Sequence, residues 1–406
     1  MAPQVVVTGM GVVCSTARSV GEFVTALRTG RCGARPITLF DTTGFAHAHG
    51  CEVRGFRPEV WVRRRPAAQL SRASQFAVAA ARMAVADAGV TEEALRARRG
   101  LVAVGTTDGG GHELDQLVAA EIADGPERLD PALAGRVSTG RLATAVTAEL
   151  GLSKVAPITL GTACASGNYA IGHGLDALRA GEVDFALCGG TDALCRRNFT
   201  GFYRLGLIAP DRCQPFDVAR RGLITGEGAG MLFLEPAETA EARGARIYAE
   251  VRGFGLSCDA AHPIAPQQEG VERCIRLALR DADVVPSEVD VISAHGTGTR
   301  ANDVTESRAI RAVFGPRLPR TVAVKSMLGH TMGAASALAG IACVLSITHG
   351  FVPPTINHGT TDPECDVDCV PNQAIYADVR VVLNNGLAFG GNNAVVVLGR
   401  FEPGKG

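Results

Sequence analysis

The sequence predicts an α/β fold that forms one compact body from two similar halves. Segments rich in β-branched residues alternate with segments of helical periodicity along the whole chain. Such alternation indicates helices packed on largely parallel sheets. The predicted elements have similar order and size in residues 1–248 and 249–406, which suggests a diverged internal duplication. No polar linker separates the halves.

Strands are predicted where β-branched and apolar residues cluster between turn residues, and helices where apolar residues recur every three or four positions. In the first half the predicted strands are 4–8, 101–105, 156–160, 184–190 and 229–235, with helices at 20–28, 71–89, 140–150 and 165–180. In the second half the strands are 247–256, 289–293, 321–324, 379–385 and 393–400, with helices at 270–282, 302–313 and 333–349. The apolar run 335–347 is too short to span a bilayer and predicts a buried helix, without membrane insertion.

Composition excludes several classes of function. The chain has 406 residues, 46% of them hydrophobic, which is enough for a sizeable core. A net charge of −1 gives no reason to expect nucleic acid or an anionic membrane as partner. No secretory signal precedes the first predicted strand, and twelve cysteines without a CxxC pair fit a reducing cytoplasm. Cys365 and Cys369 have no nearby histidine and make a weak zinc site.

Two further patterns carry little weight. Gly9-Met10-Gly11 resembles the start of a dinucleotide fingerprint, but Cys14 stands where the third glycine belongs. The run 63–65 is three arginines without interleaved aromatic residues, which is more typical of a solvated face than of a nucleic-acid site.

A candidate nucleophile lies where a predicted strand passes into a predicted helix. The segment 157–181 reads PITLGTACASGNYAIGHGLDALRAG, and Cys164 falls near the helix N-terminus. Unpaired N–H groups and the helix dipole at that position are expected to lower the pKa of the thiol. Cys164 is otherwise one of twelve cysteines that pack as small buried side chains, but the strand–turn–helix setting favours a nucleophile.

Three more candidates follow predicted strands. His295 opens a loop rich in glycine and threonine, where α/β sheets often place ligands; the alternative is a packed loop histidine. Lys325 follows the next strand, and His330 precedes a long apolar helix. The chain has only three lysines among its 40 basic residues, so a lysine at a strand end is notable.

A glycine-rich turn connects the last two predicted strands. It contains Phe389, and Gly390 and Gly391 would permit close approach of the backbone to a ligand.

The segments GTACASG, HGTGT…ND..E, KS.LGHTMGA and FGGNNA, in this order, resemble the β-ketoacyl-acyl-carrier-protein synthases. PFDVARRGLITGEGAG (215–230) resembles a further segment of that family, and the likeness covers essentially the whole chain. Elongating fatty-acid synthases and type II polyketide ketosynthases are the most similar members. The resemblance implies a thiolase-like five-layer αβαβα fold with no metal or redox cofactor. Its substrates would be carried on the phosphopantetheine of an acyl-carrier protein.

The resemblance also assigns roles to residues. Cys164 matches the acyl-accepting nucleophile, and His295 and His330 match the histidines that hold the extender thioester and promote loss of its carboxylate. Lys325 matches the lysine that organises the histidine charges, with Glu306 as its ionic neighbour. Asp303 would support the same loop.

Further roles concern the substrate. Phe389 matches the gate of the acyl pocket, and its N–H together with that of Cys164 matches the oxyanion hole. The remaining substrate-binding candidates are Thr297, Thr299, Phe202, Asp108, Ile264, Gly390 and Gly391. The candidates for docking an acidic carrier protein are Arg63, Arg64, Arg65 and Arg204.

Three positions depart from the family pattern. Ala388 stands before Phe389 where glycine is usual, and Ile264 replaces a threonine that contacts pantetheine. Asp108 falls where an apolar pocket residue is common, so it either lines the end of the acyl pocket or turns outward and caps the helix near 112–121.

Other functions are weighed against the synthase. A non-catalytic chain-length-factor-like partner would lack the nucleophilic cysteine, and a degradative thiolase would need a second catalytic cysteine near the C-terminus, where Phe389 and 392–393 stand. A cysteine hydrolase explains neither Lys325 nor the second histidine. A homodimer, or a heterodimer with a chain-length-factor homologue, is expected to form through pairing of strand 184–190.

Overall fold

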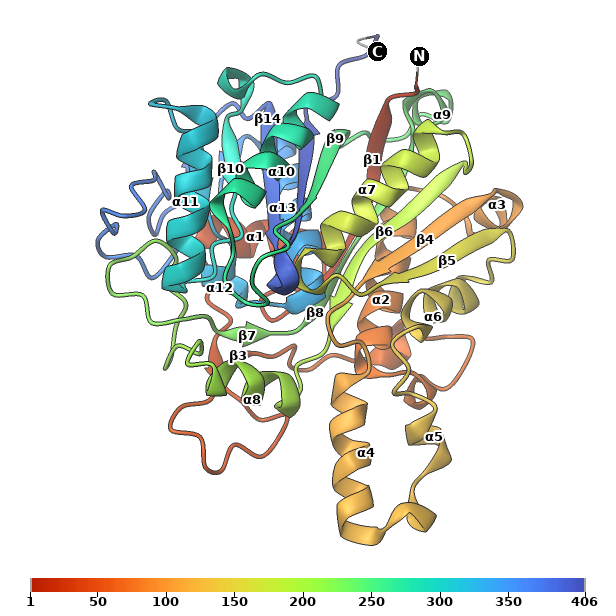
Figure 1. Ribbon diagram of the computed structural model, residues 1–406. Helices are drawn as coiled ribbons and strands as arrows, with labels where there is room; N and C mark the ends of the chain where they lie inside the picture. Colours follow the sequence, from red (N-terminus) through yellow and green to blue (C-terminus); the bar gives the residue numbers. More distant parts are fainter. Residues whose placement is uncertain (1, 405–406) are drawn as a thin grey trace.

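The protein is described here by a computed structural model covering residues 2–404 (Figure 1). Within that range, a mixed sheet of ten strands runs in the order β11-β10-β14-β15-β9-β1-β8-β6-β4-β5. Its strands are β1 (Val5–Cys14), β4 (Gly100–Gly105), β5 (Val155–Leu160), β6 (Phe185–Asp192), β8 (Gly228–Pro236), β9 (Ala249–Cys258), β10 (Val291–Ser293), β11 (Arg320–Val322), β14 (Val381–Leu387) and β15 (Asn392–Gly399). Two small sheets contain β2 (Arg35–Pro36), β3 (His49–Cys51) and β7 (Thr225–Gly226), and β12 (Phe351–Val352) and β13 (Ile375–Tyr376).

The two halves of the large sheet have one topology. Counted outward from the centre, the first half runs β1-β8-β6-β4-β5 and the second β9-β15-β14-β10-β11. The strand that comes last in the sequence of each half, β8 or β15, is antiparallel to both of its neighbours in the sheet. The three outer strands of each half are parallel to one another. The halves join where β1 pairs with β9. The predicted pair of equivalent halves is therefore confirmed.

The prediction of largely parallel sheets is wrong, because the sheet is mixed. In the second half, β14 and β15 are joined by a short turn, and such a hairpin connection makes neighbouring strands antiparallel. The order of strands and helices in the sequence does not show that the last strand of each half is antiparallel, because a parallel last strand would give the same order of elements.

Thirteen α-helices and several short 3-10 helices are described in residues 2–404. The α-helices are α1 (Val20–Thr29), α2 (Arg72–Asp87), α3 (Glu92–Ala97), α4 (Gly111–Asp124), α5 (Pro131–Ala134), α6 (Arg141–Leu150), α7 (Ser166–Arg179), α8 (Arg196–Arg204), α9 (Ala237–Ala242), α10 (Gln268–Asp281), α11 (Arg300–Phe314), α12 (Lys325–Leu328) and α13 (Ala335–His349). The 3-10 helices are η1 (Pro58–Val60), η2 (Ala67–Gln69), η3 (Pro126–Arg128), η4 (Ala163–Ala165), η5 (Pro286–Glu288), η6 (Met332–Ala334) and η7 (Phe389–Gly391).

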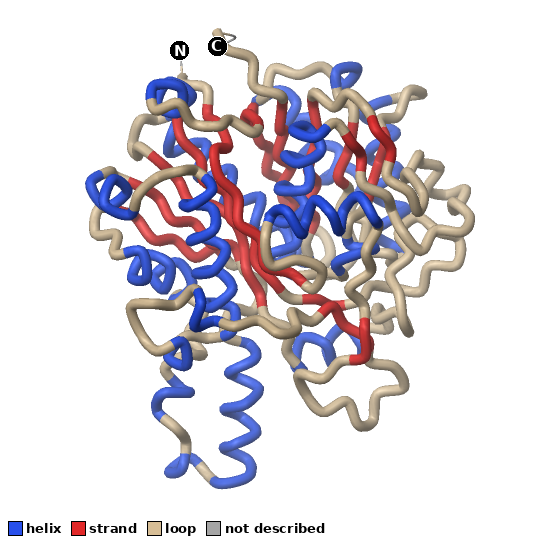
Figure 2. Tube along the Cα trace, turned by 180° about the vertical axis from the view of Figure 1, so that it is seen from behind, coloured by secondary structure: helices blue, strands red, loops and turns tan. Residues whose placement is uncertain are grey.

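Helices lie on both sides of the strands (Figure 2), and the contacts between elements order them into five layers. The helices α7 and α13 lie between the two halves of the sheet and contact strands of both. The helices α2 and α6 cover the outer face of the first half, and α10 and α11 cover that of the second. The three most extensive hydrophobic clusters of the described residues follow these layers, the largest around the two central helices. The predicted αβαβα arrangement is confirmed.

The central helix α13 explains the most apolar run of the sequence. The segment Met332–His349 is long and apolar enough to cross a membrane by length and composition, and no other described helix is. However, 89% of it is buried inside the protein. It is a core helix, as its sequence predicts.

The predicted dimerisation strand does not lie at an edge. Residues 185–190 belong to β6, which is hydrogen-bonded to β4 on one side and to β8 on the other. The edge strand of the first half is β5, whose residues 156–158 are exposed. The apolar sequence of β6 reflects burial in the sheet rather than a free edge.

An arm of α4, η3 and α5 extends from the body at the opposite end from the two termini (Figure 1). It carries exposed apolar side chains, with Val118 at 44% and Ile122 at 82% exposure. The sequence predicted only a helix near 112–121 in this region.

Glycines permit the central layer to touch the strand ends. A Cβ atom on Gly190 would lie 2.1 Å from the carbonyl oxygen of Gly333, and one on Gly105 would lie 2.3 Å from the carbonyl carbon of Ser166. Side chains at these positions would push η6 and α7 away from the sheet.

We therefore expect Gly190→Ala to lower the free energy of unfolding by about 1–3 kcal/mol, since the added methyl group overpacks rigid backbone. The matched control is Gly201→Ala in α8, where a Cβ would meet nothing within 4 Å. That control should stabilise by about 0.4–1 kcal/mol. Urea unfolding measures both, and equal stabilities of the two variants would contradict the described contact between the halves.

Candidate active site

Cys164 lies in a strained turn between β5 and α7. The chain leaves β5 at Leu160, and the residue before the cysteine, Ala163, has a φ of 50°. A non-glycine residue in this left-handed region costs about 1–3 kcal/mol and marks functional turns. Cys164 itself is buried. The predicted strand–turn–helix setting is present, with η4 inserted before α7.

Two histidines from the second half of the chain, His295 and His330, lie close to Cys164. The reactive atoms of Cys164, His295 and His330 all lie within 4.8 Å of one another. The two imidazole rings are 5.4 Å apart between centroids and stand edge to face at 81°. His295 follows β10 and His330 follows α12, so the site assembles groups from both halves of the chain.

Hydrogen bonds fix which nitrogen of each imidazole carries the proton. The main-chain N–H of Met332 donates to Nδ1 of His330 at 3.2 Å. The Nζ of Lys325 lies 3.4 Å from Nδ1 of His295, to which it can only donate. Nδ1 is therefore the acceptor in both rings, and each neutral imidazole carries its proton on Nε2. The site thus holds two Nε2–H donors beside a thiol.

This tautomer argues against a resident metal. Three side chains of cysteine and histidine could in principle hold an ion. A metal would need the lone pair of Nε2, which would move the proton to Nδ1 and set it against the N–H of Met332. The positive charge of Lys325 close to His295 would also oppose a cation. These residues do not fit a metal site.

Lys325 lies behind His295 rather than in the cavity. Its buried Nζ donates to the carbonyl oxygen of His295 at 2.6 Å. The carboxylate of Glu306 accepts from the main-chain N–H of His295 at 2.8 Å and of Gly296 at 2.9 Å. Among the described residues no ion pair within 4.0 Å joins Lys325 to Glu306, so Glu306 is a charge neighbour rather than a direct partner.

Asp303 supports the same loop. Its buried carboxylate accepts from the main-chain N–H groups of Thr297 at 3.1 Å and Gly298 at 3.2 Å, and from that of Phe216 at 2.9 Å. Asp303 thereby stabilises the loop after His295 by hydrogen bonds to its main chain, as the resemblance to the family implied.

Burial dominates the ionisation of the site. It raises the pKa of Cys164 to about 12, although the nearby charge of Lys325 lowers it. Burial likewise lowers the pKa values of His295 and His330 well below the ordinary value, and Lys325 acts in the same direction. The predicted lowering of the thiol pKa is therefore wrong, because desolvation outweighs the positive end of α7. At neutral pH all three groups are uncharged.

A cavity of about 280 Å³ leads to these groups. Eight of its lining residues were predicted as site residues, namely Cys164, Phe202, Ile264, His295, Thr297, Thr299, His330 and Phe389. The others are Leu205, Leu207, Leu223, His262, Ala265, Pro266, Ala301, Asn302, Leu387 and Ala388. Most of the lining is apolar, which suits an alkyl chain better than a sugar or nucleotide.

Two family models cover the chain. The beta-ketoacyl synthase N-terminal domain matches residues 2–240 and the beta-ketoacyl synthase C-terminal domain matches residues 248–359. The chain belongs to the β-ketoacyl synthase family.

Individual relatives cover nearly the whole chain. Nodulation protein E of Rhizobium sp. (strain N33) is 40% identical over 399 residues, which is 97% of this chain and 98% of the relative. The 3-oxoacyl-[acyl-carrier-protein] synthase 2 of Synechocystis sp. is 36% identical over 410 residues, 98% of each. Among solved structures, a chain of the ishigamide ketosynthase/chain length factor has 57% identity and a TM-score of 0.98, with 99% of this chain and 100% of that chain covered.

The turn before β15 positions the predicted gate of this ketosynthase. The rings of Phe389 and Phe202 are 5.6 Å apart. Gly390 and Gly391 have φ values of 79° and 74° and form the turn behind Phe389 rather than lining the cavity. The N–H of Gly390 donates to the carbonyl of Pro263 at 2.8 Å, which fastens loop 259–266 to the turn. Gly390 and Gly391 were expected to contact the substrate, but in the structure they allow the turn to contact loop 259–266 instead.

Asp108 lies outside the cavity of its own chain and does not cap α4. Its carboxylate forms an ion pair with Arg197 at 2.7 Å and does not line the cavity. The N-cap of α4 is Gly110, without a side-chain cap. The ion pair with Arg197 compensates the negative charge of the Asp108 carboxylate, so neither hydration nor a helix N-terminus is required to stabilise it.

The predicted docking arginines are dispersed. The main-chain N–H groups of Arg63 and Arg64 donate to the carboxylate of Glu149, and none of residues 63–65 lines the catalytic cavity. Arg204 is exposed next to Leu205, which does line it. Of the four, only Arg204 lies beside the mouth of the cavity.

Several positioning residues were not identified from the sequence. Asn168 in α7 donates from Nδ2 to the carbonyls of Asn384 and Ala394, at 2.8 and 2.9 Å. Asn385 donates to Glu306 at 3.0 Å. These asparagines lie in a helix and a strand that are largely buried. A polar residue within a segment predicted to be buried was the sign in the sequence that could have identified them.

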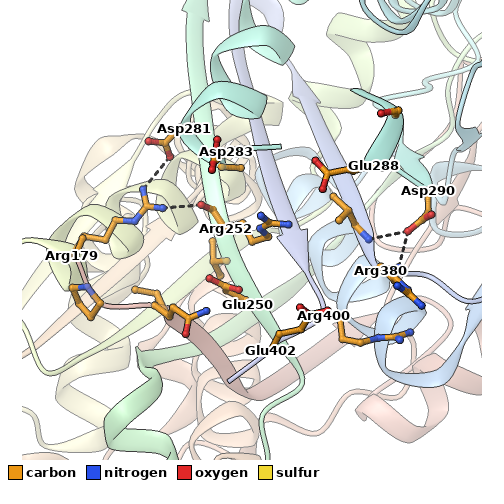
Figure 3. Close-up of a pocket in the computed structure, with 18 residues that line it drawn as sticks. Arg179, Glu250, Arg252, Asp281, Asp283, Glu288, Asp290, Arg380, Arg400 and Glu402 are labelled. Atoms are coloured by element: carbon orange, nitrogen blue, oxygen red, sulfur yellow. Dashed lines mark hydrogen bonds and ion pairs between the residues drawn. The ribbon is translucent and has the colours of Figure 1, made fainter. Parts of the chain in front are cut away.

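A larger cavity, about 870 Å³, lies near both ends of the chain, and Figure 3 shows the residues that line it. Its lining alternates arginines with carboxylates, and several of them pair with one another, as Arg179 does with Asp281 at 3.0 Å. It contains no cysteine or histidine. The chemistry therefore belongs to the smaller, apolar cavity.

The raised thiol pKa predicts how Cys164 reacts with iodoacetamide. The thiolate fraction of a group with a pKa near 12 rises about tenfold per pH unit, so alkylation should accelerate steadily from pH 7 to 9.5. Peptide mass spectrometry separates Cys164 from Cys258, the exposed cysteine. A rate that levels off near pH 7 would show that the thiol is acidic after all.

Proposed function

We propose that this chain is a β-ketoacyl synthase that accepts an acyl group on Cys164 and extends it by decarboxylative condensation with malonyl-acyl-carrier protein. One observation carries this proposal: the thiol of Cys164 and one ring nitrogen from each of His295 and His330 lie within 4.8 Å of one another at an apolar cavity. The name of the Synechocystis relative, a 3-oxoacyl-[acyl-carrier-protein] synthase, supports substrates bound to a carrier protein.

In the first half-reaction, the sulfur of Cys164 attacks the carbonyl carbon of the carrier thioester. The main-chain N–H groups of Cys164 and Phe389, two residues that line the same cavity, are the proposed donors to the tetrahedral oxyanion. Collapse breaks the bond to the pantetheine sulfur, which leaves with the proton of the Cys164 thiol. The acyl group then lies in a buried site, protected from water.

In the second half-reaction, the bond between the malonyl α-carbon and its carboxylate breaks and carbon dioxide leaves. The electron pair forms an enolate, whose charge develops on the thioester oxygen. His295 and His330 each donate an Nε2–H to that oxygen, and each donor contributes roughly 2.7–4 kcal/mol by analogy with single oxyanion donors. The enolate carbon attacks the acyl carbonyl and expels the Cys164 sulfur as a thiolate, which takes up one proton from solvent, since the original thiol proton left with the pantetheine.

The histidines suit this role because they stay neutral. Their pKa values are lowered by burial and by Lys325, so both remain Nε2–H donors near neutral pH. The same cysteine, histidines and lysine argue against a non-catalytic chain-length-factor-like subunit, which would lack the nucleophile.

A second subunit of the same fold is proposed to pair with β5. The apolar edge of this strand is exposed, with Ile158 at 37%, and a free edge invites pairing with another strand. The similar ishigamide protein is a ketosynthase/chain length factor, which favours a homologous partner over an identical one. All twelve cysteines are free, which agrees with a cytoplasmic protein.

Substitutions should separate the two half-reactions. Cys164→Ala should abolish acyl loading from an acyl-carrier protein, measured by intact mass. His295→Ala and His330→Ala should still load Cys164 but lose carbon dioxide release from malonyl-carrier protein by about 10²–10³-fold, as for single oxyanion donors. If both histidine variants release carbon dioxide at the wild-type rate, the assigned roles are wrong.

Ile158→Asp should separate the dimer, because a charge on the paired edge is costly to bury. Light scattering of the chain alone, and after co-expression with a chain-length-factor homologue, decides which partner is used. The matched control is Val218→Asp, at an exposed apolar residue outside the strands of the large sheet (60% exposed). A dimer that survives Ile158→Asp would exclude β5 as the interface.

A further inference from the structure

Asp192, the last residue of β6, is a fully buried carboxylate outside the catalytic cavity. It accepts five hydrogen bonds. The donors are Thr106 Oγ1 at 2.7 Å and the main-chain N–H groups of Thr107 at 2.7 Å, Asp108 at 3.0 Å, Gly109 at 3.0 Å and Gly333 at 2.6 Å. Donors to an ionised acceptor are among the stronger hydrogen bonds in proteins.

These bonds cross between the two halves of the chain. Residues 106–109 follow β4 of the first half, and Gly333 belongs to η6 of the second. The contact leaves no space, since a Cβ on Gly333 would lie 2.3 Å from Thr106 Cα and 2.8 Å from Asp192 Oδ2. Asp192 therefore fixes where η6 sits against the sheet.

The position of η6 determines that of His330. The residue before Gly333 is Met332, whose N–H donates to Nδ1 of His330. Met332 has a φ of 52°, a conformation held only by its surroundings. We propose that Asp192 is a positioning residue for condensation: its carboxylate fixes η6 and so aims the Nε2–H of His330 at the substrate. This assignment rests on the proposed function.

A second effect of Asp192 does not depend on that function. Its negative charge raises the pKa of Cys164, as does that of Asp108, while Lys325 lowers it and the two histidines face it uncharged. Burial raises the pKa of Asp192 to about 6, so its carboxylate is ionised above pH 7. Removing this charge should therefore make the thiol more acidic.

Asp192→Asn tests both effects on the full-length protein. Its amide keeps the size of the side chain but removes the charge and turns one acceptor into a donor. We expect carbon dioxide release to fall by about 10–100-fold, since a misplacement on the order of 1 Å can cost about 10²-fold. Acyl loading should stay within about threefold of wild type, and Cys164 should alkylate faster at each pH between 7 and 9.5.

The matched control is Asp217→Asn. Asp217 is an equally buried carboxylate that accepts the main-chain N–H groups of Ala219, Gly359 and Thr360. It should leave the alkylation profile of Cys164 unchanged. If Asp192→Asn does not fold, Asp192→Glu replaces it: the charge is kept, so the alkylation profile stays, whereas the longer side chain displaces η6 and carbon dioxide release falls.

An alkylation profile of Asp192→Asn identical to wild type, or an equal fall in loading and carbon dioxide release, would overturn the proposal. Wild-type protein that alkylates as expected but releases no carbon dioxide would instead contradict the proposed function. The two failures are thus distinguishable.

Discussion

The catalytic arrangement depends on hydrogen bonds that the two imidazoles accept at Nδ1. The main-chain N–H of Met332 and the amine of Lys325 occupy those nitrogens and leave Nε2–H on the side of the thiol. Each donor is itself fixed by packing: Met332 by the turn of η6, and Lys325 by its bond to the carbonyl of His295. Burial keeps the rings neutral, so this arrangement holds across the physiological pH range.

The close approach of the two halves makes this possible. The thiol comes from the first half and both histidines come from the second, and glycines at the strand ends allow the central layer to reach the sheet. The short β1–β9 pairing alone would not hold such geometry, because it involves only two residue pairs. The buried carboxylate of Asp192 and the amide of Asn168 add direct bonds between the halves.

From the sequence, the order of predicted elements indicated the two halves, whereas the layered fold and the joint roles of Cys164, His295 and His330 followed from the motifs shared with β-ketoacyl synthases. The sequence could not give strand direction, the paired state of Asp108 or the pKa of the thiol. Each of these depends on which distant groups meet: Arg197 for Asp108, and complete desolvation for Cys164. A local helix N-terminus predicts an acidic thiol only where water still reaches it.

The two central helices begin in the same unusual way. Ala163 and Met332 have φ values of 50° and 52°, and each starts a 3-10 turn that leads into α7 or α13. The turn at Ala163 positions the nucleophile Cys164, while the turn at Met332 determines which ring nitrogen of His330 carries the proton. The two halves therefore share one backbone device but use it differently, so a change that relaxes either turn would disturb only one partner of the catalytic pair.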